Sequence, residues 1–592
     1  MRVADYIFKV LADQGLKDVF LVTGGGAMHL NDALKKESRL KYTCCHHEQA
    51  CAIAAEGYYR ASGRLPVVSV TTGPGGTNAM TGVIGAWLDS IPMLVISGQV
   101  KFETTIASCR EIGLRQLGDQ EINIIDIVRP VTKYARMVTD PLAIGVELNS
   151  ALRAATSGRP GPVWLDIPLN VQGAILPDDY PVTLPDKPFL PVLTPPGEQI
   201  AELMALIDQS HRPVVIAGHG IELAGAEPAF AKLLERVEMP VLTTFNSMNI
   251  LPSDHPLFFG RIGSVGQRKG NFILQNADLV ISIGSRNNIR QISYNWENFA
   301  KNAKKVVVDV DEAELQKPTV VPDLAIHADA LEFISAWQNE VVPSAHPKWL
   351  DWCRKIRARY PAHTIRQASL VAGVNPYHFT HELTRLCPDG ATVVTGNGMA
   401  CVAMFQTGIS KSGIRVFWNS GCASMGYDIP AAEGAAVATG RLTLCVAGDG
   451  SSMMNIQELG TIAYNRLPVK IFVLENGGYM SIRQTQRNLF SGDFIGCGPA
   501  SGVGFPDFKG LAAAFGLPCS EINGHAELEM KLNRILSTKS PEVIVVHVPP
   551  EIEFSPKLSA RRLPDGTMVS PSLEDMFPFL DRNEMEENIC KI

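Results

Sequence analysis

The chain has 592 residues, of which 46% are hydrophobic and 19% charged, and this is the composition of a globular protein rather than of a long disordered one. At roughly 100–200 residues per domain, about three to five domains are expected. The net charge is −7 and no block of lysine or arginine stands out, which argues against nucleic acid as a main partner.

The amino-terminal residues and the cysteines indicate the compartment. Residues 1–20 have the pattern of an amphipathic helix that runs into a strand, and they lack the features of a secretory signal. No uninterrupted apolar stretch reaches the roughly 18 residues of a membrane span, so no membrane contact is expected. The 12 cysteines are scattered without a Cys-x-x-Cys pair, which favours reduced thiols, most of them buried small side chains. We therefore expect a cytoplasmic protein.

Short apolar runs rich in Val and Ile alternate with helical patterns along the whole chain, for example VVSV, PMLVISG, PVVIAG, DLVISIG, KVVVDVD, TLCVAGD, KIFVLEN and EVIVVHV. Strands that are buried on both faces have this appearance, so the pattern predicts an α/β fold with parallel sheets. In such sheets ligands bind beyond the carboxyl ends of the strands. The glycine and polar residues that end these runs are therefore the candidates for chemistry.

Two seams divide the chain into blocks of similar size. Residues 172–198 contain seven prolines and no helical period, which predicts a linker. Residues 341–375 contain three prolines around a basic helix and predict a second crossing segment. We expect three doubly wound parallel-sheet domains, at residues 1–180, 195–340 and 365–550, and a carboxyl-terminal tail at residues 551–592.

The strongest chemical signal lies in the third block. Asp449, within a Gly-Asp-Gly-Ser run, follows one predicted strand, and Asn476 follows the next strand 27 residues later, before two glycines. A carboxylate and an amide oxygen from adjacent strand ends can ligate Mg²⁺, which prefers oxygen ligands and keeps phosphate oxygens in its shell. Glycines and a helix N-terminus suit a diphosphate. Gly-Asp-Gly alone is usually only a turn, but the two motifs together predict a metal–diphosphate site.

This spacing resembles the thiamine diphosphate (ThDP) signature of the decarboxylase and carboligase superfamily. The order of segments over residues 1–550 is similar to that of the acetolactate synthase family. The resemblance implies a pyrimidine-binding, a central and a diphosphate-binding domain, with Asp449, Asn476 and Gly478 as ligands of Mg²⁺. It also implies that Glu48 hydrogen-bonds the aminopyrimidine ring of ThDP, and that Gln120 lines the active site. Without the other motifs, Glu48 would be only a glutamate near a helix N-terminus.

The resemblance extends to the cofactor-binding loops of both outer domains. Met425 would pack beneath the bent cofactor, although a methionine at such a turn is more often core filler. The backbone carbonyl of Ala423 would accept a hydrogen bond from the aminopyrimidine. The full set of implied ThDP-binding residues is Gly25, Thr72, Asn78, Asn397, Gly398, Met399, Ala423, Met425, Gly450 and Ser451.

The central block raises the question of a flavin. Arg286 and Arg290 have the spacing seen in flavin-binding members of the family, and Asp309, Asp311 and Asp329 also match. Arginines can pair with a diphosphate and a carboxylate can hold a ribose. We expect FAD, bound by Arg286, Arg290, Asp311 and Asp329. Because residues 260–266 lack the usual Met-His pair, an ADP-type ligand or an empty domain stays open. In this family the flavin is not consumed by a redox step.

Four positions depart from the family and bear on specificity. Asp119 stands where the family usually has Phe, Thr485 where it has Trp, Leu169 where it has Lys and Glu475 where it has Asn. A pocket that loses Phe and Trp would admit a larger and more polar acceptor, selected through hydrogen bonds to its hydroxyl groups.

The resemblance implies a transferase: ThDP- and Mg²⁺-dependent decarboxylation of a 2-oxo acid, with pyruvate expected, and transfer of the two-carbon unit to a second carbonyl compound. The cofactor would lie between the first domain of one subunit and the third of another, so a homodimer or homotetramer is expected. Three alternatives stay open: a ketone or nucleotide keto-sugar as acceptor, a hydrolase or lyase acting on a cyclic dione, and a non-catalytic nucleotide-binding protein. The tail would cover a neighbouring subunit or form a lid over the active site.

Overall fold

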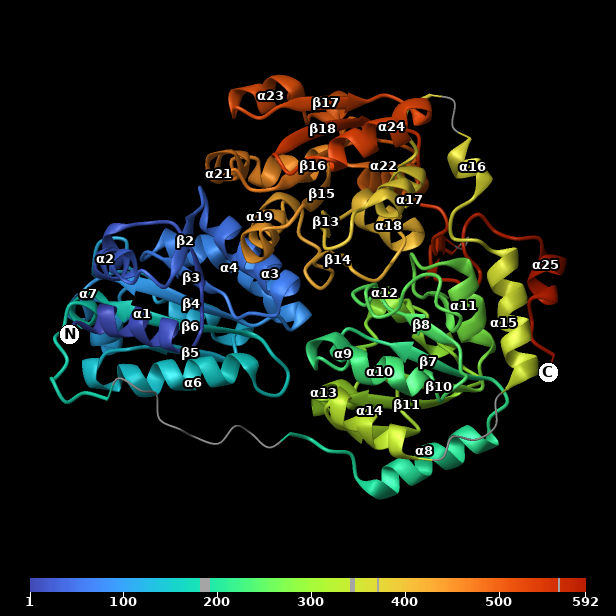
Figure 1. Cartoon of the computed structure of the whole chain (residues 1–592), viewed down its shortest axis with the longest axis horizontal. Helices are drawn as coiled ribbons and strands as arrows, with labels where there is room; N and C mark the ends of the chain where they lie inside the picture. Colours follow the sequence, from blue (N-terminus) through green and yellow to red (C-terminus); the bar gives the residue numbers. More distant parts are fainter. Residues whose placement is uncertain (182–191, 341–345, 370–371, 563–564, 592) are drawn as a thin grey trace.

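The computed structural model describes residues 1–181, 192–340, 346–369, 372–562 and 565–591. It contains three six-stranded sheets, all parallel and flanked by helices, which confirms the predicted fold class. Figure 1 shows the first sheet on the left, the central sheet at the lower right and the third sheet at the top. We call the parts of the chain that carry these sheets the first, central and third domains.

The first domain has the strand order β2-β1-β3-β4-β6-β5. Helices α1, α2, α6 and α7 share one hydrophobic core with the sheet, and α3, α4 and α5 share another, so the sheet is covered on both faces. The strands are β1 (Asp18–Leu21), β2 (Lys41–Cys44), β3 (Val67–Val70), β4 (Met93–Gln99), β5 (Tyr134–Met137) and β6 (Pro162–Pro168). The helices are α1 (Val3–Asp13), α2 (Met28–Lys36), α3 (Glu48–Ser62), α4 (Pro74–Asp89), α5 (Ile124–Val128), α6 (Ile144–Thr156) and α7 (Leu169–Gln172).

The central domain has the order β12-β11-β10-β7-β8-β9 around one hydrophobic core. Its strands are β7 (Pro213–Ala217), β8 (Val241–Thr243), β9 (Phe258–Arg261), β10 (Leu279–Ile283), β11 (Lys304–Asp309) and β12 (Leu324–His327). Its helices are α8 (Gly197–Gln209), α9 (Gly220–Leu223), α10 (Glu227–Leu234), α11 (Arg268–Asn276), α12 (Ile289–Ile292), α13 (Glu312–Leu315) and α14 (Ala330–Asn339).

The two predicted seams flank this domain. Residues 182–191 of the linker and residues 341–345 and 370–371 of the second seam lie outside the described residues. The expected basic helix is α15 (Pro347–Arg359), which packs on the central core through buried Trp349, and the short α16 (Ile365–Ala368) follows it. The Trp349 indole N–H donates to the carbonyl of Pro213 at 2.9 Å.

The third domain has the order β14-β13-β15-β16-β18-β17. Its strands are β13 (Thr392–Thr395), β14 (Arg415–Phe417), β15 (Thr443–Gly448), β16 (Val469–Glu475), β17 (Cys519–Ile522) and β18 (Glu542–His547). Its helices are α17 (Pro376–Leu386), α18 (Met399–Thr407), α19 (Asp428–Thr439), α20 (Asp449–Ser452), α21 (Glu458–Asn465), α22 (Met480–Leu489), α23 (Phe508–Ala514) and α24 (His525–Leu536).

The first and third domains meet through helices α3 and α19. These helices approach so closely that a Cβ atom added at Gly57 would lie 2.2 Å from the carbonyl oxygen of Ala431. A Cβ added at Gly434 would lie 1.8 Å from the carbonyl oxygen of Ala54. Only glycine fits at these two positions, so the sequence itself fixes the spacing between the two helices.

Two expectations about the chain's surroundings can be compared with the structure. All 12 cysteines are free thiols. Among the described residues, no helix is both long and apolar enough to cross a membrane.

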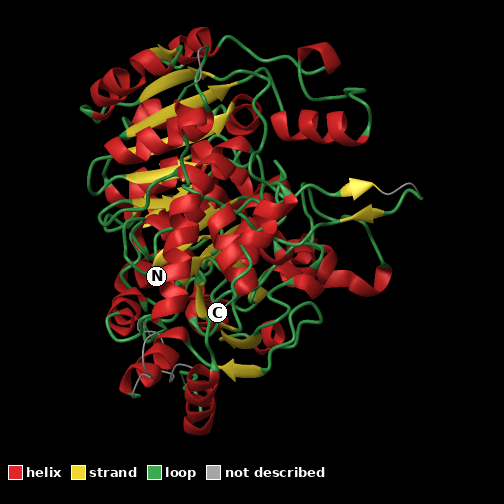
Figure 2. Cartoon of the chain, turned by 90° about the vertical axis from the view of Figure 1, so that its right-hand side faces the viewer, coloured by secondary structure: helices red, strands yellow, loops and turns green. Residues whose placement is uncertain are grey.

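The tail packs against the central domain of its own chain. Leu573 belongs to the central hydrophobic core, and its carbonyl accepts a hydrogen bond from Asn271 of α11 at 2.9 Å. Beyond it, α25 (Arg582–Glu587) lies beside α15, where the dark red segment runs in Figure 1. The short strands β19 (Arg561–Arg562) and β20 (Met568–Val569) stand clear of the body in Figure 2.

Replacing Leu573 with alanine is expected to destabilise the central domain, although the residue lies more than 230 positions beyond that domain's last strand. Leu573 is 2% exposed, and emptying such a site costs about 2–5 kcal/mol. Thermal unfolding should show a transition lowered by several degrees. The matched control is Ile589→Ala in the same tail, which removes a 56% exposed side chain and should leave the transition in place. Equal melting curves for both variants would contradict the packing described.

Candidate active site

Two neighbouring strands of the third sheet lead into the residues predicted to hold Mg²⁺. β15 leads into Asp449 and β16 into Asn476, and the two strands pair in parallel, so their carboxyl ends meet at one edge of the sheet. The Asp449 carboxylate accepts hydrogen bonds from the backbone N–H groups of Gly450 at 2.7 Å, Asn476 at 3.1 Å and Gly478 at 2.9 Å. The structure therefore brings the three predicted metal ligands together.

The side chain of Asn476 completes a donor set suited to a cation. Its Oδ1 atom is buried and has no hydrogen-bond partner among the described residues. A buried acceptor without a partner costs free energy, so such an atom needs a ligand. Burial also raises the pKa of Asp449, which a neighbouring divalent cation would oppose. An unpaired amide oxygen beside a buried carboxylate fits Mg²⁺.

Hydrogen bonds tie the remaining loops of this domain around the same edge. The Asn397 side chain donates to the carbonyl of Ser424 at 2.8 Å, and the Ser451 hydroxyl accepts from the Gly426 N–H at 2.9 Å. The predicted ThDP-binding residues of this domain all lie in these loops or in the helical turns that follow them: Asn397, Gly398, Met399, Ala423, Met425, Gly450 and Ser451. Met425 is half-buried.

Ala423 adopts a backbone conformation that non-glycine residues rarely take, with φ of 54°. The side chain of Asn419 holds it there, because its Oδ1 accepts from the N–H groups of Cys422 and Ala423, both at 3.2 Å. The Asn419 amide in turn donates to both carboxylate oxygens of buried Glu56 on α3, at 3.2 and 3.1 Å. A residue of the first domain thus supports the loop whose carbonyl was predicted to contact the cofactor. No motif in the sequence predicted this role for Glu56.

Glu48 begins α3 in the first domain and is buried. Its Oε2 atom accepts a hydrogen bond from the Asn78 side chain of α4 at 3.0 Å. The structure thus pairs two residues that the sequence analysis had assigned separately, one as the catalytic carboxyl and one as a cofactor ligand.

Gln120 and Gly73 lie against each other at one end of this domain. Gln120 is exposed and has a φ of 59°, and its carbonyl oxygen would lie 2.3 Å from a Cβ atom added at Gly73. Only glycine therefore permits this approach. Gly25 is exposed in the turn after β1, and Thr72 precedes Gly73.

Behind Thr72 runs a buried chain of polar side chains. The Thr72 hydroxyl donates to Gln99 Oε1 at 2.5 Å, and the Gln99 amide donates to Asp166 Oδ2 at 3.2 Å. Asp166 also accepts from the Ser97 hydroxyl at 2.6 Å. Burial raises the pKa of the Asp166 carboxyl to about 7, although both hydrogen bonds favour the ionised form.

This raised pKa predicts a dependence of stability on pH. Between its ordinary value of about 3.9 and about 7, native Asp166 keeps a proton that the unfolded chain has lost. The native state therefore binds more protons, and its stability falls as pH rises through this window. The free energy of unfolding of the wild type, relative to Asp166→Asn, should fall by up to about 1.4 kcal/mol per pH unit from pH 5 to 7. Parallel stability profiles of the two proteins in urea would contradict this.

The first-domain set and the third-domain set are not joined directly to each other. Among the residues described, no hydrogen bond or ion pair links Glu48, Asn78, Thr72 or Gln120 to the metal site around Asp449. The link between the two halves is indirect and runs from Glu56 through Asn419 to the loop of Ala423.

The positions that depart from the family are placed as follows. Thr485 is exposed on α22, and its hydroxyl donates to the carbonyl of Ser481 at 3.0 Å. The neighbouring Gln484 and Arg487 bind the carboxylate of Glu553 in the tail, at 3.2 and 2.7 Å. The other three departures are at Asp119, which is exposed, Leu169, which begins α7, and Glu475, whose carboxylate lies 2.8 Å from His547 Nδ1.

A cavity of about 620 Å³ lies in the central domain and is closed by residues of both other domains. The predicted nucleotide ligands Arg286 and Asp329 line it, as do Arg159 of the first domain and Ser420 of the third. Arg290 is not one of the lining residues, but its guanidinium lies 4.6 Å from the ring centre of Phe245, which is. Arg290 Nη1 is buried without a hydrogen-bond partner in the described chain, which suits a phosphate group.

Asp311 is not among the residues that line this cavity. Its carboxylate caps α13 by accepting from the Ala313 N–H, pairs with Arg159 at 2.9 Å and lines a neighbouring hollow. Asp309, the last residue of β11, lines the cavity instead, and burial raises its pKa to about 6. The strand end itself is the better predictor of a ligand, because parallel strands deliver their last residues to this edge.

The cavity and its polar lining fit a dinucleotide. Half-buried arginines at Arg286 and Arg290 lie in or near it, the carboxylates of Asp309 and Asp329 line it, and its volume is in the range of cofactor sites.

Comparisons with known proteins agree with these observations. Residues 1–124 match the thiamine pyrophosphate enzyme N-terminal TPP binding domain, residues 200–337 the central domain, and residues 396–548 the C-terminal TPP binding domain. The chain is 32% identical over 556 residues to the acetolactate synthase isozyme 1 large subunit of Escherichia coli, which covers 93% of this chain and 95% of that protein. It is 31% identical over 565 residues to acetolactate synthase 1, chloroplastic, of Zea mays, covering 94% and 86%. With all three domains matched and the relationship extending over its whole length, the chain belongs to the thiamine diphosphate-dependent enzymes of the acetolactate synthase-like family.

Proposed function

We propose that this enzyme decarboxylates a 2-oxo acid, with pyruvate as the first candidate, and transfers the two-carbon unit to a second carbonyl compound. The observation that carries the proposal is that Asp449 and Asn476, whose side-chain oxygen is unpaired among the described residues, meet at one sheet edge, in a chain similar to an acetolactate synthase over 93% of its length. ThDP, when bound, supplies an acidic thiazolium carbon and an acceptor for the electrons released with carbon dioxide.

The chain's own residues would orient this chemistry and hold its protons. Asp449, Asn476 and Gly478 would hold Mg²⁺ and through it the diphosphate. Glu48, supported by Asn78, would hold a proton at the pyrimidine ring. The carbonyl of Ala423, fixed by Asn419, would accept from the amino group of the pyrimidine.

The central cavity supports FAD as a further resident cofactor. Its diphosphate would pair with Arg286 and Arg290, and Asp309 or Asp329 would bind a ribose. A purified protein with a flavin absorption spectrum, lost in Arg290→Ala, would support this assignment. Release of ADP alone from the denatured protein would replace it with the alternative ligand.

The first acceptor to consider is a second 2-oxo acid, as the names of the relatives indicate. One observation favours a ketone or nucleotide keto-sugar as the alternative acceptor. Thr485 places a small hydroxyl side chain on α22 where the family has Trp. A small polar side chain leaves room for, and can hydrogen-bond, a hydroxylated acceptor.

The experiment that tests the proposal measures carbon dioxide release from pyruvate with ThDP and Mg²⁺, alone and with a panel of acceptors. Acetolactate from pyruvate alone supports the first acceptor. Carbon dioxide release that requires a keto-sugar supports the second. No decarboxylation of any 2-oxo acid, with cleavage of a cyclic dione instead, would overturn the proposal in favour of a hydrolase or lyase.

We propose further that the enzyme is a homodimer or homotetramer in which each active site combines two chains. Exposed apolar side chains occur near both halves of the site, on the loop before Gln120 and beyond α20 and α22. A partner subunit would cover these side chains. They are Ile112, Leu114, Leu117, Met453, Met454, Phe490 and Ile495. Glu48 and Asp449 of one site would then come from different subunits.

This arrangement predicts that two inactive variants restore each other. When Glu48→Gln and Asp449→Asn proteins are mixed and reassembled, each heterodimer has one site with both lesions and one site with neither. Roughly a quarter of wild-type activity should return at statistical exchange. If both residues served a site within one chain, no mixture would recover activity. Light scattering on the same samples establishes the oligomer size.

A further inference from the structure

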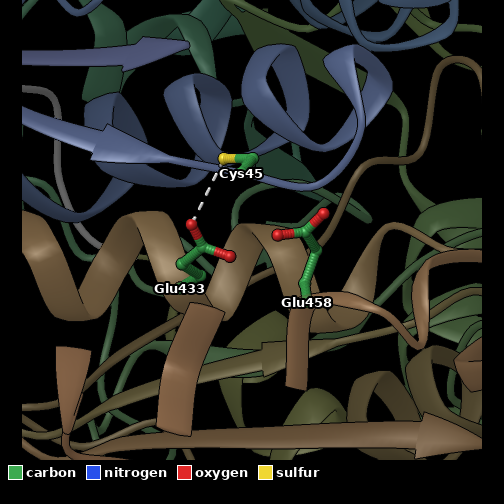
Figure 3. Close-up of side chains that lie close together, drawn as sticks. All are labelled: Cys45, Glu433 and Glu458. Atoms are coloured by element: carbon green, nitrogen blue, oxygen red, sulfur yellow. Dashed lines mark hydrogen bonds between the residues drawn. The ribbon is translucent and has the colours of Figure 1, made fainter. Parts of the chain in front are cut away.

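A group of three buried side chains joins the first and third domains outside the site described above. Cys45 follows β2 of the first domain, Glu433 lies on α19 and Glu458 begins α21 (Figure 3). The Cys45 thiol lies 3.4 Å from Glu433 Oε1, and one ligand atom from each of the three residues lies within 4.8 Å of the others. All three residues are buried, and both glutamates are fully so.

The two buried carboxylates face each other, and few hydrogen bonds compensate for their negative charge. Glu458 accepts from the His46 N–H at 3.0 Å and from the Thr461 hydroxyl at 2.6 Å. Glu433 accepts only the weak thiol hydrogen bond, and its Oε2 atom is buried with no partner among the described residues. Figure 3 shows this second oxygen directed toward Glu458. No ion pair in the described chain reaches either carboxylate, so the group holds protons or a cation.

We propose that Cys45, Glu433 and Glu458 bind a divalent metal ion of the zinc class. Zinc bonds of about 2.3 Å to sulfur and 2.0 Å to oxygen at tetrahedral angles separate the two ligand atoms by about 3.5 Å. The Cys45–Glu433 separation of 3.4 Å suits this geometry. A thiolate ligand selects against Mg²⁺ and Ca²⁺, which take oxygen, and thus separates this site from the Mg²⁺ site at Asp449.

The metal would cross-link the two domains at their tightest contact. Glu433 precedes Gly434, which packs directly on Ala54 of α3. Cys45 lies three residues before Glu48, the first residue of α3. On binding, the thiol loses its proton to solvent, and the ion replaces protons that otherwise neutralise the carboxylates.

The test uses the full-length protein saturated with ThDP and Mg²⁺. After dialysis against Zn²⁺ and then metal-free buffer, elemental analysis should find one zinc per chain. With Co²⁺ instead, a near-ultraviolet thiolate-to-cobalt band should appear in the difference spectrum. Cys45→Ser should lose this band and bind zinc at least tenfold more weakly. The matched control is Cys44→Ser, which changes the adjacent exposed cysteine and should retain both signals.

A second variant separates lost binding from lost folding. Glu433→Ile replaces a buried carboxyl by an apolar side chain of similar size, a change that is often neutral or stabilising in a folded protein. It should melt at or above the wild-type temperature without zinc, and zinc should raise the melting temperature of the wild type only. If the wild type holds no more zinc than Cys45→Ser, or Glu433→Ile binds zinc equally well, the group holds protons and the proposal is overturned. Neither outcome bears on the decarboxylase proposal.

Discussion

Replacing Glu48 with glutamine is expected to lower the rate of carbon dioxide release from the 2-oxo acid by about 100- to 10,000-fold, the range of a lost general acid–base group. Glutamine has nearly the same shape, so its carbonyl can still accept from Asn78, but it cannot hold or release a proton. Bound ThDP, measured after gel filtration, should stay close to the wild-type amount. The loss should therefore appear in kcat rather than in cofactor affinity.

The matched control for this variant is Glu37→Gln, which changes a first-domain glutamate that pairs with Arg39 on the surface. It should retain wild-type turnover. Full activity in Glu48→Gln would remove Glu48 from the mechanism. A protein that loses ThDP as well as turnover would assign Glu48 a binding role instead.

The second large effect is expected at the metal site. Asp449→Asn removes the only carboxylate among the three predicted ligands, and it should abolish Mg²⁺-dependent retention of ThDP and, with it, decarboxylation. Replacing a metal ligand should reduce metal affinity or activity by more than the 10–100-fold that is typical when a residue supporting a ligand is replaced. The measurement is ThDP binding by calorimetry across a series of Mg²⁺ concentrations.

Asn476→Ala provides the sharper version of this test. Because Asn476 Oδ1 is buried and unpaired among the described residues, its removal should leave the melting temperature of the apoprotein unchanged or higher. If this oxygen binds the cation, the affinity of the variant for Mg²⁺–ThDP should fall all the same. The control is Asn465→Ala on α21 of the same domain, whose amide bonds only the Thr461 carbonyl. Unchanged cofactor affinity in Asn476→Ala would remove it from the metal site.

The strands and the metal edge could be predicted because local pattern determines them. Valine- and isoleucine-rich runs ending in glycine or a polar residue became the parallel strands, and the residues after β15 and β16 met at one edge, as parallel pairing requires. Glu48 and Asn78 lie on α3 and α4, the helices that follow β2 and β3, and these two strands flank β1 in the sheet.

What the sequence could not show depends on contacts between distant segments. Asp311 matched a family position, but its carboxylate caps α13 and pairs with Arg159 of another domain, whereas Asp309 lines the cavity. The support of Ala423 by Glu56 requires the docking of α3 on α19. In the sequence, Glu433 is one polar residue in an alanine-rich helix. Its position opposite Glu458 becomes visible only in the folded chain.

The packing of the tail on the central domain affects the order in which the domains fold during synthesis. Leu573 completes a hydrophobic core whose strands end at residue 327, so the central domain emerges from the ribosome long before the residue that closes it. Domains fold as units in the order of synthesis when their contacts are local, and non-local contacts delay them. The first domain can close its core early, whereas the last contacts of the central core form only after the tail has been made. A stalled or truncated chain would therefore expose apolar surface in its middle, which is where chaperones should bind it.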